Sequence, residues 1–142
     1  IALGLESDSL PDAYTSRGWC HEQAGHYREA LADYATALAL DPQHCLALNN
    51  MAWIRATCPV DELRDGRAAV HYALAACEQT DWEEANFLDT LAAAQAELGN
   101  FAEAIRLVQE AIACEGEDAS ALLEHMQSFE QHRPLRSGSR KS

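Results

Sequence analysis

Cysteine and histidine are the residue types in this chain that could bind a metal ion or form a redox site. No two of the five cysteines form a Cys-x-x-Cys pair; they are Cys20, Cys45, Cys58, Cys77 and Cys114. His21 and His26 are five residues apart, whereas two zinc ligands on one helix are four apart. We therefore expect no structural metal, no cofactor and no disulfide. Thiols packed as small apolar groups are the preferred interpretation, and redox or metal roles are the alternative.

Catalytic motifs are a second kind of chemistry that the sequence could carry. The chain contains no glycine-rich phosphate loop, no Gly-x-Ser-x-Gly and no His-Glu-x-x-His. Its acidic pairs, Asp61-Glu62 and Glu83-Glu84, fall at predicted loops or helix starts, where carboxylates stabilise the helix dipole. The sequence therefore predicts a protein that is not an enzyme.

The charge of the chain is strongly negative and unevenly distributed. It has 142 residues, with 10 Lys and Arg against 23 Asp and Glu and a formal net charge of −13. Residues 1–132 hold six of the basic residues and all 23 acids, a formal charge of −17. A domain with this negative charge repels the phosphate backbone of nucleic acids, so we expect basic partners and no nucleic acid. The alternative is that the acids only keep a helical surface soluble.

The chain lacks the usual signals for a membrane or for export. No apolar stretch approaches the ~20 residues of a membrane span. The chain opens at Ile1 without a basic n-region, so we expect no signal peptide. Scattered free cysteines are typical of a reducing compartment, so we expect a cytoplasmic protein. Because the chain begins at Ile1, we expect a fragment or a processed form.

Small residues recur at matched spacings in two parts of the chain. In each part the second small residue follows the first by 12 positions, and a third follows seven later. They are Gly18, Ala30 and Ala37 in the first part, and Ala92, Ala104 and Ala111 in the second. Two antiparallel helices approach closely only where their side chains are small, so each set predicts a helical hairpin. Gly25 and Gly99 are predicted to end the first helix of each hairpin in a left-handed conformation.

A third copy lies between these two and contains an insertion. Ala52 follows Gly18 by 34 residues, and Ala69 and Ala76 are again seven apart. The interval from Ala52 to Ala69 is 17, so five residues are inserted between the two helices. Pro59 is expected to end the first helix, and Asp65 to cap the second.

The order of glycine, aromatic, alanine and proline residues resembles the tetratricopeptide repeat (TPR), whose period is 34 residues. The resemblance covers residues 11–118. Segments 48–59, 64–66 and 88–93 resemble a group of bacterial TPR arrays with the same long loop. The resemblance implies an all-α, right-handed solenoid of three hairpins over residues 11–44, 45–83 and 85–118.

The ends of the chain complete the predicted architecture. An apolar stripe at helical spacing in residues 119–132 predicts a capping helix, which closes a domain of residues 1–132. Residues 133–142 are predicted to be a disordered basic tail. Seven helices are expected in all, with residues 1–8 holding at most the end of another helix.

The TPR resemblance implies a concave groove lined by the first helix of each hairpin. The residues that the register places there as peptide-binding candidates are Asp12, Ser16, Trp19, Glu22, Gln23, Asn49, Asn50, Trp53, Asn86, Asp89 and Glu97. The same register includes Thr15, Leu46, Ala56, Thr57, Thr90, and Ala93. Trp19 and Trp53 are 34 residues apart and are expected to lie one above the other, as binding anchors or as core residues between hairpins. The asparagines can pair with a peptide backbone or face solvent without a role.

The groove positions contain no lysine and no arginine. An acidic peptide ending in a carboxylate is therefore a poor ligand, and a basic and apolar segment fits better. The predicted function is a protein–protein interaction module that binds such a segment in the groove. The alternative is a structural scaffold that forms homo-oligomers through the open edges of its repeats.

Overall fold

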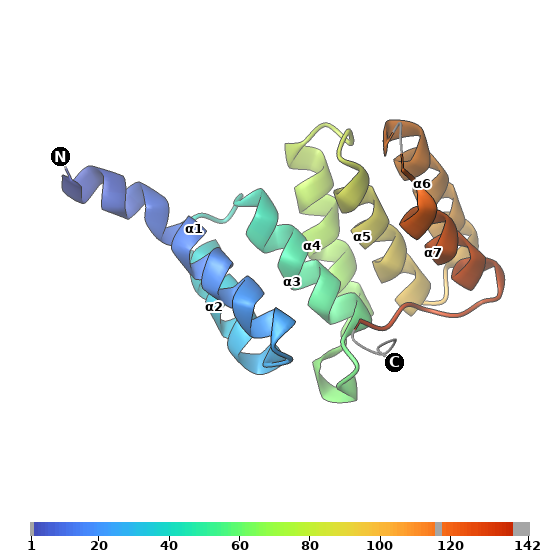
Figure 1. Cartoon of the computed structure of the whole chain (residues 1–142), viewed down its shortest axis with the longest axis horizontal. Helices are drawn as coiled ribbons and strands as arrows, with labels where there is room; N and C mark the ends of the chain where they lie inside the picture. The colour runs from blue at the N-terminus through green and yellow to red at the C-terminus, as the bar shows by residue number, and fades with distance from the viewer. Residues whose placement is uncertain (1, 116–117, 138–142) are drawn as a thin grey trace.

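The structure of the protein is a computed structural model that describes residues 2–115 and 118–137. Within these residues it has seven α-helices and one short 3-10 helix, η1, and no strand. They are α1 (Ala2–Gln23), α2 (Tyr27–Leu40), α3 (Cys45–Thr57), η1 (Asp61–Leu63), α4 (Gly66–Gln79), α5 (Ala85–Glu97), α6 (Phe101–Glu115) and α7 (Ser120–Glu130). Helices α1 to α6 pack as three hairpins, and α7 packs on α6, as Figure 1 shows. The predicted all-α stack of helical hairpins is confirmed.

In the described ranges, no helix is both long and apolar enough to cross a membrane.

The small residues lie where the helices of each hairpin cross. Six of them are buried: Gly18, Ala30, Ala52, Ala69, Ala92 and Ala104. A Cβ atom on Gly18 would lie 2.7 Å from Cε1 of Tyr34, so only glycine permits this approach of α1 to α2. The predicted burial of these residues is confirmed, and their spacing sets the register of each hairpin.

The turns within the hairpins follow from particular residues. Gly25 and Gly99 have φ angles of +85° and +86°, the left-handed region in which other residues are strained. Each lies shortly after the first helix of its hairpin. In the second hairpin, α3 ends at Thr57 before Pro59, and the side chain of Asp65 accepts a hydrogen bond of 3.1 Å from the Ala68 N–H at the start of α4. The predicted end of α3 and the predicted cap of α4 are both confirmed.

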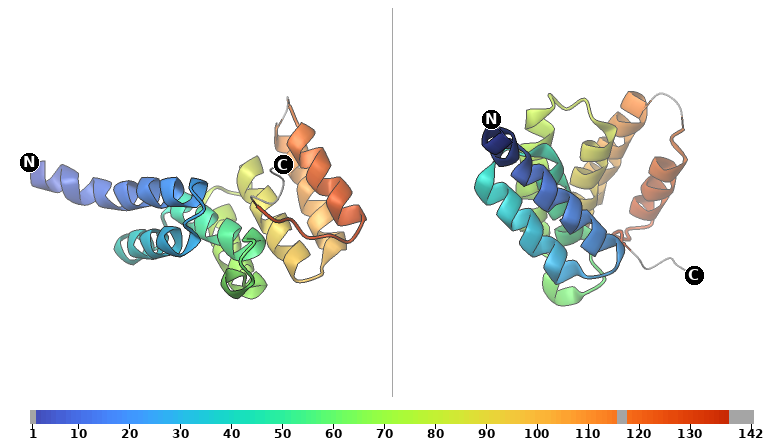
Figure 2. Two further views of the ribbon diagram at one scale, coloured as in Figure 1. Left: turned by 60° about the horizontal axis from the view of Figure 1, so that its bottom comes forward. Right: turned by 60° about the vertical axis from the view of Figure 1, so that its left-hand side comes forward.

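The N-terminal residues differ from expectation. Residues 2–8 continue the first helix of the first hairpin, and α1 runs without a break through Pro11 to Gln23. The proline is tolerated here, although it removes one backbone donor from the helix. The first turns of α1 therefore extend beyond α2, as the left view of Figure 2 shows. Ile1 lies outside the described residues.

The C-terminal helix covers the last hairpin, as predicted. Leu122 and Phe129 are buried in the main core, and Met126 packs against it, whereas Leu123 is 45% exposed. After α7 the chain turns at His132, whose ring stacks on Phe101 with 5.2 Å between ring centroids.

Residues 133–137 belong to the segment that the sequence led us to expect as disordered. In the structure they run back from α7 past α5 to α3 (Figure 1). The backbone N–H of Ser137 donates a 2.8 Å hydrogen bond to the carbonyl of Thr57, the last residue of α3. An apolar residue, Leu135, packs against two of the core clusters. The rest of the expected tail, residues 138–142, lies outside the described residues.

The cysteines are divided between the core and the surface. Cys58 and Cys77 are buried, and burial raises the pKa of the Cys77 thiol to about 12. These two thiols pack as small apolar groups. Cys20 on α1 is exposed and so is Cys114, so the expectation that the thiols pack as small apolar groups is wrong for these two. The exposure of Cys114 follows from its place in the helix. It lies in the last turn of α6, beyond the buried positions of that helix.

Candidate functional site

The inner face of the stack contains a cavity of about 330 Å³ that is lined by four helices. The residues that line it are Trp19, Glu22, Gln23, Asn49, Asn50, Trp53, Asn86, Asp89, Thr90 and His125. Eight of the eleven candidate residues from the sequence are in this set. We call this space the inner cavity.

The packing of the first helices explains why a space remains. Helix α3 packs closely on α5, whereas α1 makes few contacts with α3. Trp19 and Trp53, at equivalent positions of the first two hairpins, both line the inner cavity. Trp19 is 52% exposed, whereas Trp53 is partly buried and packs against a buried cluster that includes Ala56 and Ala93. Neither indole is fully buried, and Trp19 is the more open of the two.

Glu22 lies in a hydrogen-bonded network at the wall of the inner cavity. The hydroxyl of Tyr34 donates to Oε1 of Glu22 at 2.7 Å. Burial raises the pKa of Glu22, and the hydrogen bond from Tyr34 opposes this shift. Burial also raises the pKa of Tyr34. The network therefore fixes the orientation of Glu22 while its surroundings disfavour its charge.

Asp89 and His125 close the opposite wall. Asp89 is buried, and its Oδ1 accepts a hydrogen bond of 2.9 Å from Nδ1 of His125 on α7. The imidazole ring of His125 lies near the indole of Trp53, with 6.2 Å between ring centroids. Helix α7 thus supplies a residue of the inner cavity in addition to covering the core.

The asparagines provide the amide groups of the site. Asn49 has a buried Oδ1 without a hydrogen-bond partner among the described residues. Asn86 is exposed at the start of α5, and Asn50 is partly buried. A buried acceptor without a partner is destabilising, so Oδ1 of Asn49 carries an unsatisfied hydrogen bond in this site.

Three of the candidate residues do not line the inner cavity. Asp12 is exposed on α1 and lies 2.6 Å from Nε2 of His44. Ser16 is exposed on the same helix. Glu97, at the end of α5, accepts hydrogen bonds from Arg64 at 3.3 Å and Arg136 at 2.9 Å. The carboxylates of Asp12 and Glu97 are therefore both engaged by side chains of the protein itself.

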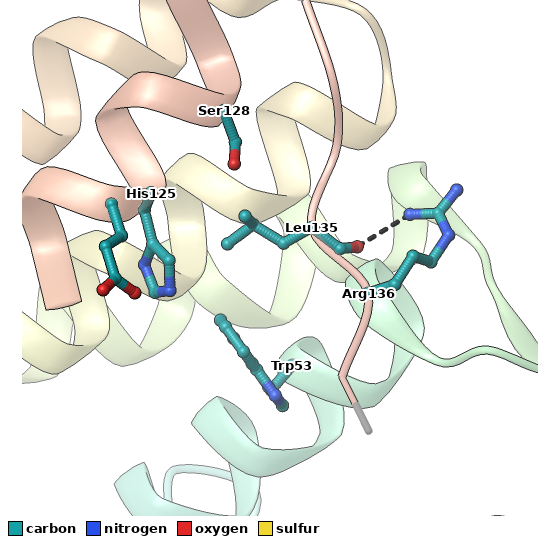
Figure 3. A pocket seen from close by; sticks show the side chains of 6 residues that line it. Trp53, His125, Ser128, Leu135 and Arg136 are labelled. Carbon is teal, nitrogen blue, oxygen red and sulfur yellow. Dashed lines mark hydrogen bonds between the residues drawn. The ribbon is translucent and has the colours of Figure 1, made fainter. Parts of the chain in front are cut away.

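A second cavity of about 290 Å³ adjoins the first, and Figure 3 shows it from close by. Its lining residues are Trp53, Glu124, His125, Ser128, Leu135 and Arg136. Trp53 and His125 line both cavities, so the two spaces are parts of one concave surface.

Sequence reasoning missed His125 and the residues that follow α7. The groove register covers the first helices of three hairpins only, and the apolar stripe in residues 119–132 predicts a cap. Helix α7 follows α6 as the first helix of a further hairpin would. Applying the register to this helix as well would have directed attention to its inner face.

Four register positions that were expected to line the groove are buried and line neither cavity, and one of them is Thr15 on α1. The other three are Ala56 and Thr57 on α3 and Ala93 on α5. Ala56 and Ala93 belong to one buried cluster, against which Leu135 and Trp53 pack. The chain's own C-terminal residues therefore lie over part of the inner face.

Comparison with known protein families found a similarity in the first hairpin. A family model described as the tetratricopeptide repeat matches residues 11–44. This segment is similar to a tetratricopeptide repeat. The boundaries are those predicted for the first copy, and TPR modules typically bind other proteins without catalysing a reaction. No curated protein sequence matches the chain.

The TPR match agrees with the chemistry of the site. Among the described residues, no group of three His, Cys, Asp or Glu side chains could hold a metal ion. The inner cavity instead combines two indoles, three asparagines and two carboxylates. Such a surface is suited to contacts with a polypeptide.

Proposed function

We propose that the protein is an interaction module whose concave surface binds an extended segment of a partner protein. The observation that carries this proposal is the composition of the inner cavity. The two tryptophans that are one repeat period apart, Trp19 and Trp53, line it together with three asparagines, Asn49, Asn50 and Asn86. Large aromatic side chains at the centre of a contact contribute most of the affinity of many interfaces. Amide side chains both donate and accept, as a peptide backbone requires.

The partner segment is expected to contain basic and apolar residues. The exposed face of Trp19 can pack on an aliphatic side chain or lie under an arginine, an arrangement that is stabilising by about 0.5–1 kcal/mol at exposed sites. The formal charge of −13 attracts such a segment from a distance. Glu97 is paired with Arg136, and the pKa of Glu22 is raised. The electrostatic attraction of a basic segment therefore comes more from the net charge of the whole protein than from those two side chains.

Selection from a library of random displayed peptides tests this proposal. Peptides that bind the wild-type chain are expected to be rich in arginine, lysine and apolar residues. Trp19→Ala should weaken their binding at least tenfold, since loss of a true anchor costs about 2 kcal/mol or more. Trp82 provides a matched control, because this exposed tryptophan lies in the turn after α4 and does not line the inner cavity.

Salt dependence separates the electrostatic contribution from the aromatic one. Raising the ionic strength should slow association, because exposed charges are screened over roughly 8 Å at physiological salt. The dissociation rate should change little with salt and much with Trp19→Ala. Selected peptides that bind Trp19→Ala and Trp82→Ala chains equally well would contradict the proposed site.

Self-assembly as a scaffold is a second candidate, favoured by an apolar surface on α1. Leu10 is 43% exposed and, with Ala13, Tyr14 and Arg17, lines a shallow depression of about 220 Å³. If copies associate through this surface, the mass in solution should rise with concentration, and Leu10→Lys should return the chain to a monomer. A constant monomeric mass would exclude this candidate.

A further inference from the structure

The C-terminal segment, residues 133–137, lies on the inner face as a bound peptide would. Leu135 packs against a buried cluster that includes Ala56 on α3 and Ala93 on α5. Figure 3 shows its side chain above Trp53 and on the side of His125. An aliphatic residue of the chain itself thus fills a space between the first helices of two hairpins.

A backbone hydrogen bond also holds the C-terminal segment, in addition to its side-chain contacts. The Ser137 N–H donates to the carbonyl of Thr57 at 2.8 Å. The last four carbonyls of a helix have no partner within that helix, so the end of α3 offers acceptors to any extended chain that passes it. This contact depends on the backbone and would be available to a segment of another protein.

A charge contact fixes the residue after Leu135. Nη1 of Arg136 donates to Oε1 of Glu97 at 2.9 Å, and Nε of Arg64 lies 3.3 Å from the other oxygen of the same carboxylate. The Glu97 side chain is only 18% exposed. A largely buried carboxylate requires a cationic partner or hydrogen-bond donors, which favours arginine at this place.

The surface under the C-terminal segment is continuous with the inner cavity. Trp53 and His125 line both the inner cavity and the adjoining cavity that contains Leu135 and Arg136. A segment that enters beside Trp19 and continues past Trp53 would reach the place that Leu135 occupies.

We propose that this place is a recognition site for an extended partner segment in which an aliphatic residue precedes an arginine, and that residues 134–137 are its internal competitor. The proposal rests on the proposed function and specifies the sequence that the concave surface recognises. The chemistry of the site supports it: an apolar floor for the aliphatic residue, the Glu97 carboxylate for the arginine and the Thr57 carbonyl for the backbone.

Competition between the two segments gives a direct test. The probe is a fluorescein-labelled peptide, His-Arg-Pro-Leu-Arg-Ser, which copies residues 132–137. A short tether holds the internal segment at an effective concentration on the order of millimolar, so it should exclude a weak peptide. Full chains with Leu135→Ser or Arg136→Ala should therefore bind the probe at least ten times more tightly than the wild-type chain, measured by fluorescence anisotropy.

Arg133→Ala is the matched control for Arg136→Ala. Arg133 is exposed and does not line either cavity, so this variant should bind the probe as weakly as the wild-type chain. A probe with serine in place of its leucine should bind none of the chains. Circular dichroism of each variant checks that the helices remain folded.

Two results would overturn the proposal. Equal affinity of the probe for the wild-type, Leu135→Ser and Arg136→Ala chains would show that the internal segment does not compete. The second result is that neither the Leu135→Ser chain nor the Arg136→Ala chain binds the probe at about 1 mM, which is the effective concentration of a tethered segment. This result would show that the place does not recognise this sequence.

The library-selected peptides distinguish this failure from failure of the proposed function. Peptides that depend on Trp19 and bind wild-type and Leu135→Ser chains equally would leave the function standing and remove the internal competitor. The converse outcome has two parts: the probe binds only the Leu135→Ser and Arg136→Ala chains, and no library peptide depends on Trp19. This outcome would support the recognition site and contradict the role of the inner cavity.

Discussion

Nδ1 of His125 lies 2.9 Å from Oδ1 of Asp89, and this hydrogen bond joins the capping helix to the first helix of the third hairpin. It ties a residue of the inner cavity to a residue 36 positions away in the chain. The carboxylate is buried, so its partner affects the stability of the fold as well as the shape of the site.

His125→Ala should destabilise the chain by about 1–3 kcal/mol, because the buried Asp89 carboxylate loses its hydrogen-bond donor. Urea denaturation measures this change in the free energy of unfolding. Gln127→Ala, at an exposed position of the same helix, should have little effect. A loss for His125→Ala no larger than that of the control would show that the pair contributes nothing to stability.

Ala104→Leu should cost roughly 1–3 kcal/mol, because the added carbons have no space where α6 crosses α5. Ala104 is fully buried. Ala102 is exposed on the same helix, so Ala102→Leu adds the same atoms without crowding. Thermal unfolding of the two variants compares them directly, and equal melting temperatures would show that the register of the third hairpin is wrong.

Glu22→Gln should raise the melting temperature near neutral pH. Because burial raises the pKa of Glu22, the folded chain binds this proton more tightly than the unfolded chain does. Its contribution to stability is therefore greatest at low pH and falls as pH rises from the ordinary glutamate pKa of 4.5 through the raised value. Glutamine keeps an oxygen for the Tyr34 hydroxyl and does not ionise.

The gain from Glu22→Gln should accordingly disappear in acid, near pH 4, where the folded wild-type chain is also protonated at this position. Melting curves over a pH series provide the measurement. Glu29→Gln changes an exposed carboxylate of the same hairpin and serves as the control. A pH-independent difference between Glu22→Gln and the wild type would contradict the assignment.

The fluorescence of Trp53 should report docking of the C-terminal segment. The chain has three tryptophans, so Trp19→Phe with Trp82→Phe leaves Trp53 as the single emitter. In that background Leu135→Ser should shift the emission to longer wavelength, because the indole loses apolar cover. Leu123→Ser, at an exposed position of α7, should leave the spectrum unchanged. Identical spectra for both variants would mean that Leu135 does not cover Trp53.

The sequence by itself determined the hairpins and much of the inner cavity. Gly25 and Gly99 mark turns that require a left-handed residue, and the alanine spacing marks the helix crossings. These signals are local, because a turn or a crossing is encoded within one repeat. Trp19 and Trp53 share a register position, so the repeat period predicts that they lie one above the other, and the TPR resemblance implies that this position faces the groove. Both line the inner cavity.

Only the tertiary structure decided which carboxylates remain unpaired and what covers the groove. Glu97 meets Arg136 from 39 positions away, and Asp89 meets His125 on the capping helix. Residues 133–137 carry no periodic pattern, so composition alone suggested disorder. Their place is set by a hydrophobic contact, a helix-end carbonyl and a buried carboxylate, three partners that come together only after the hairpins have stacked.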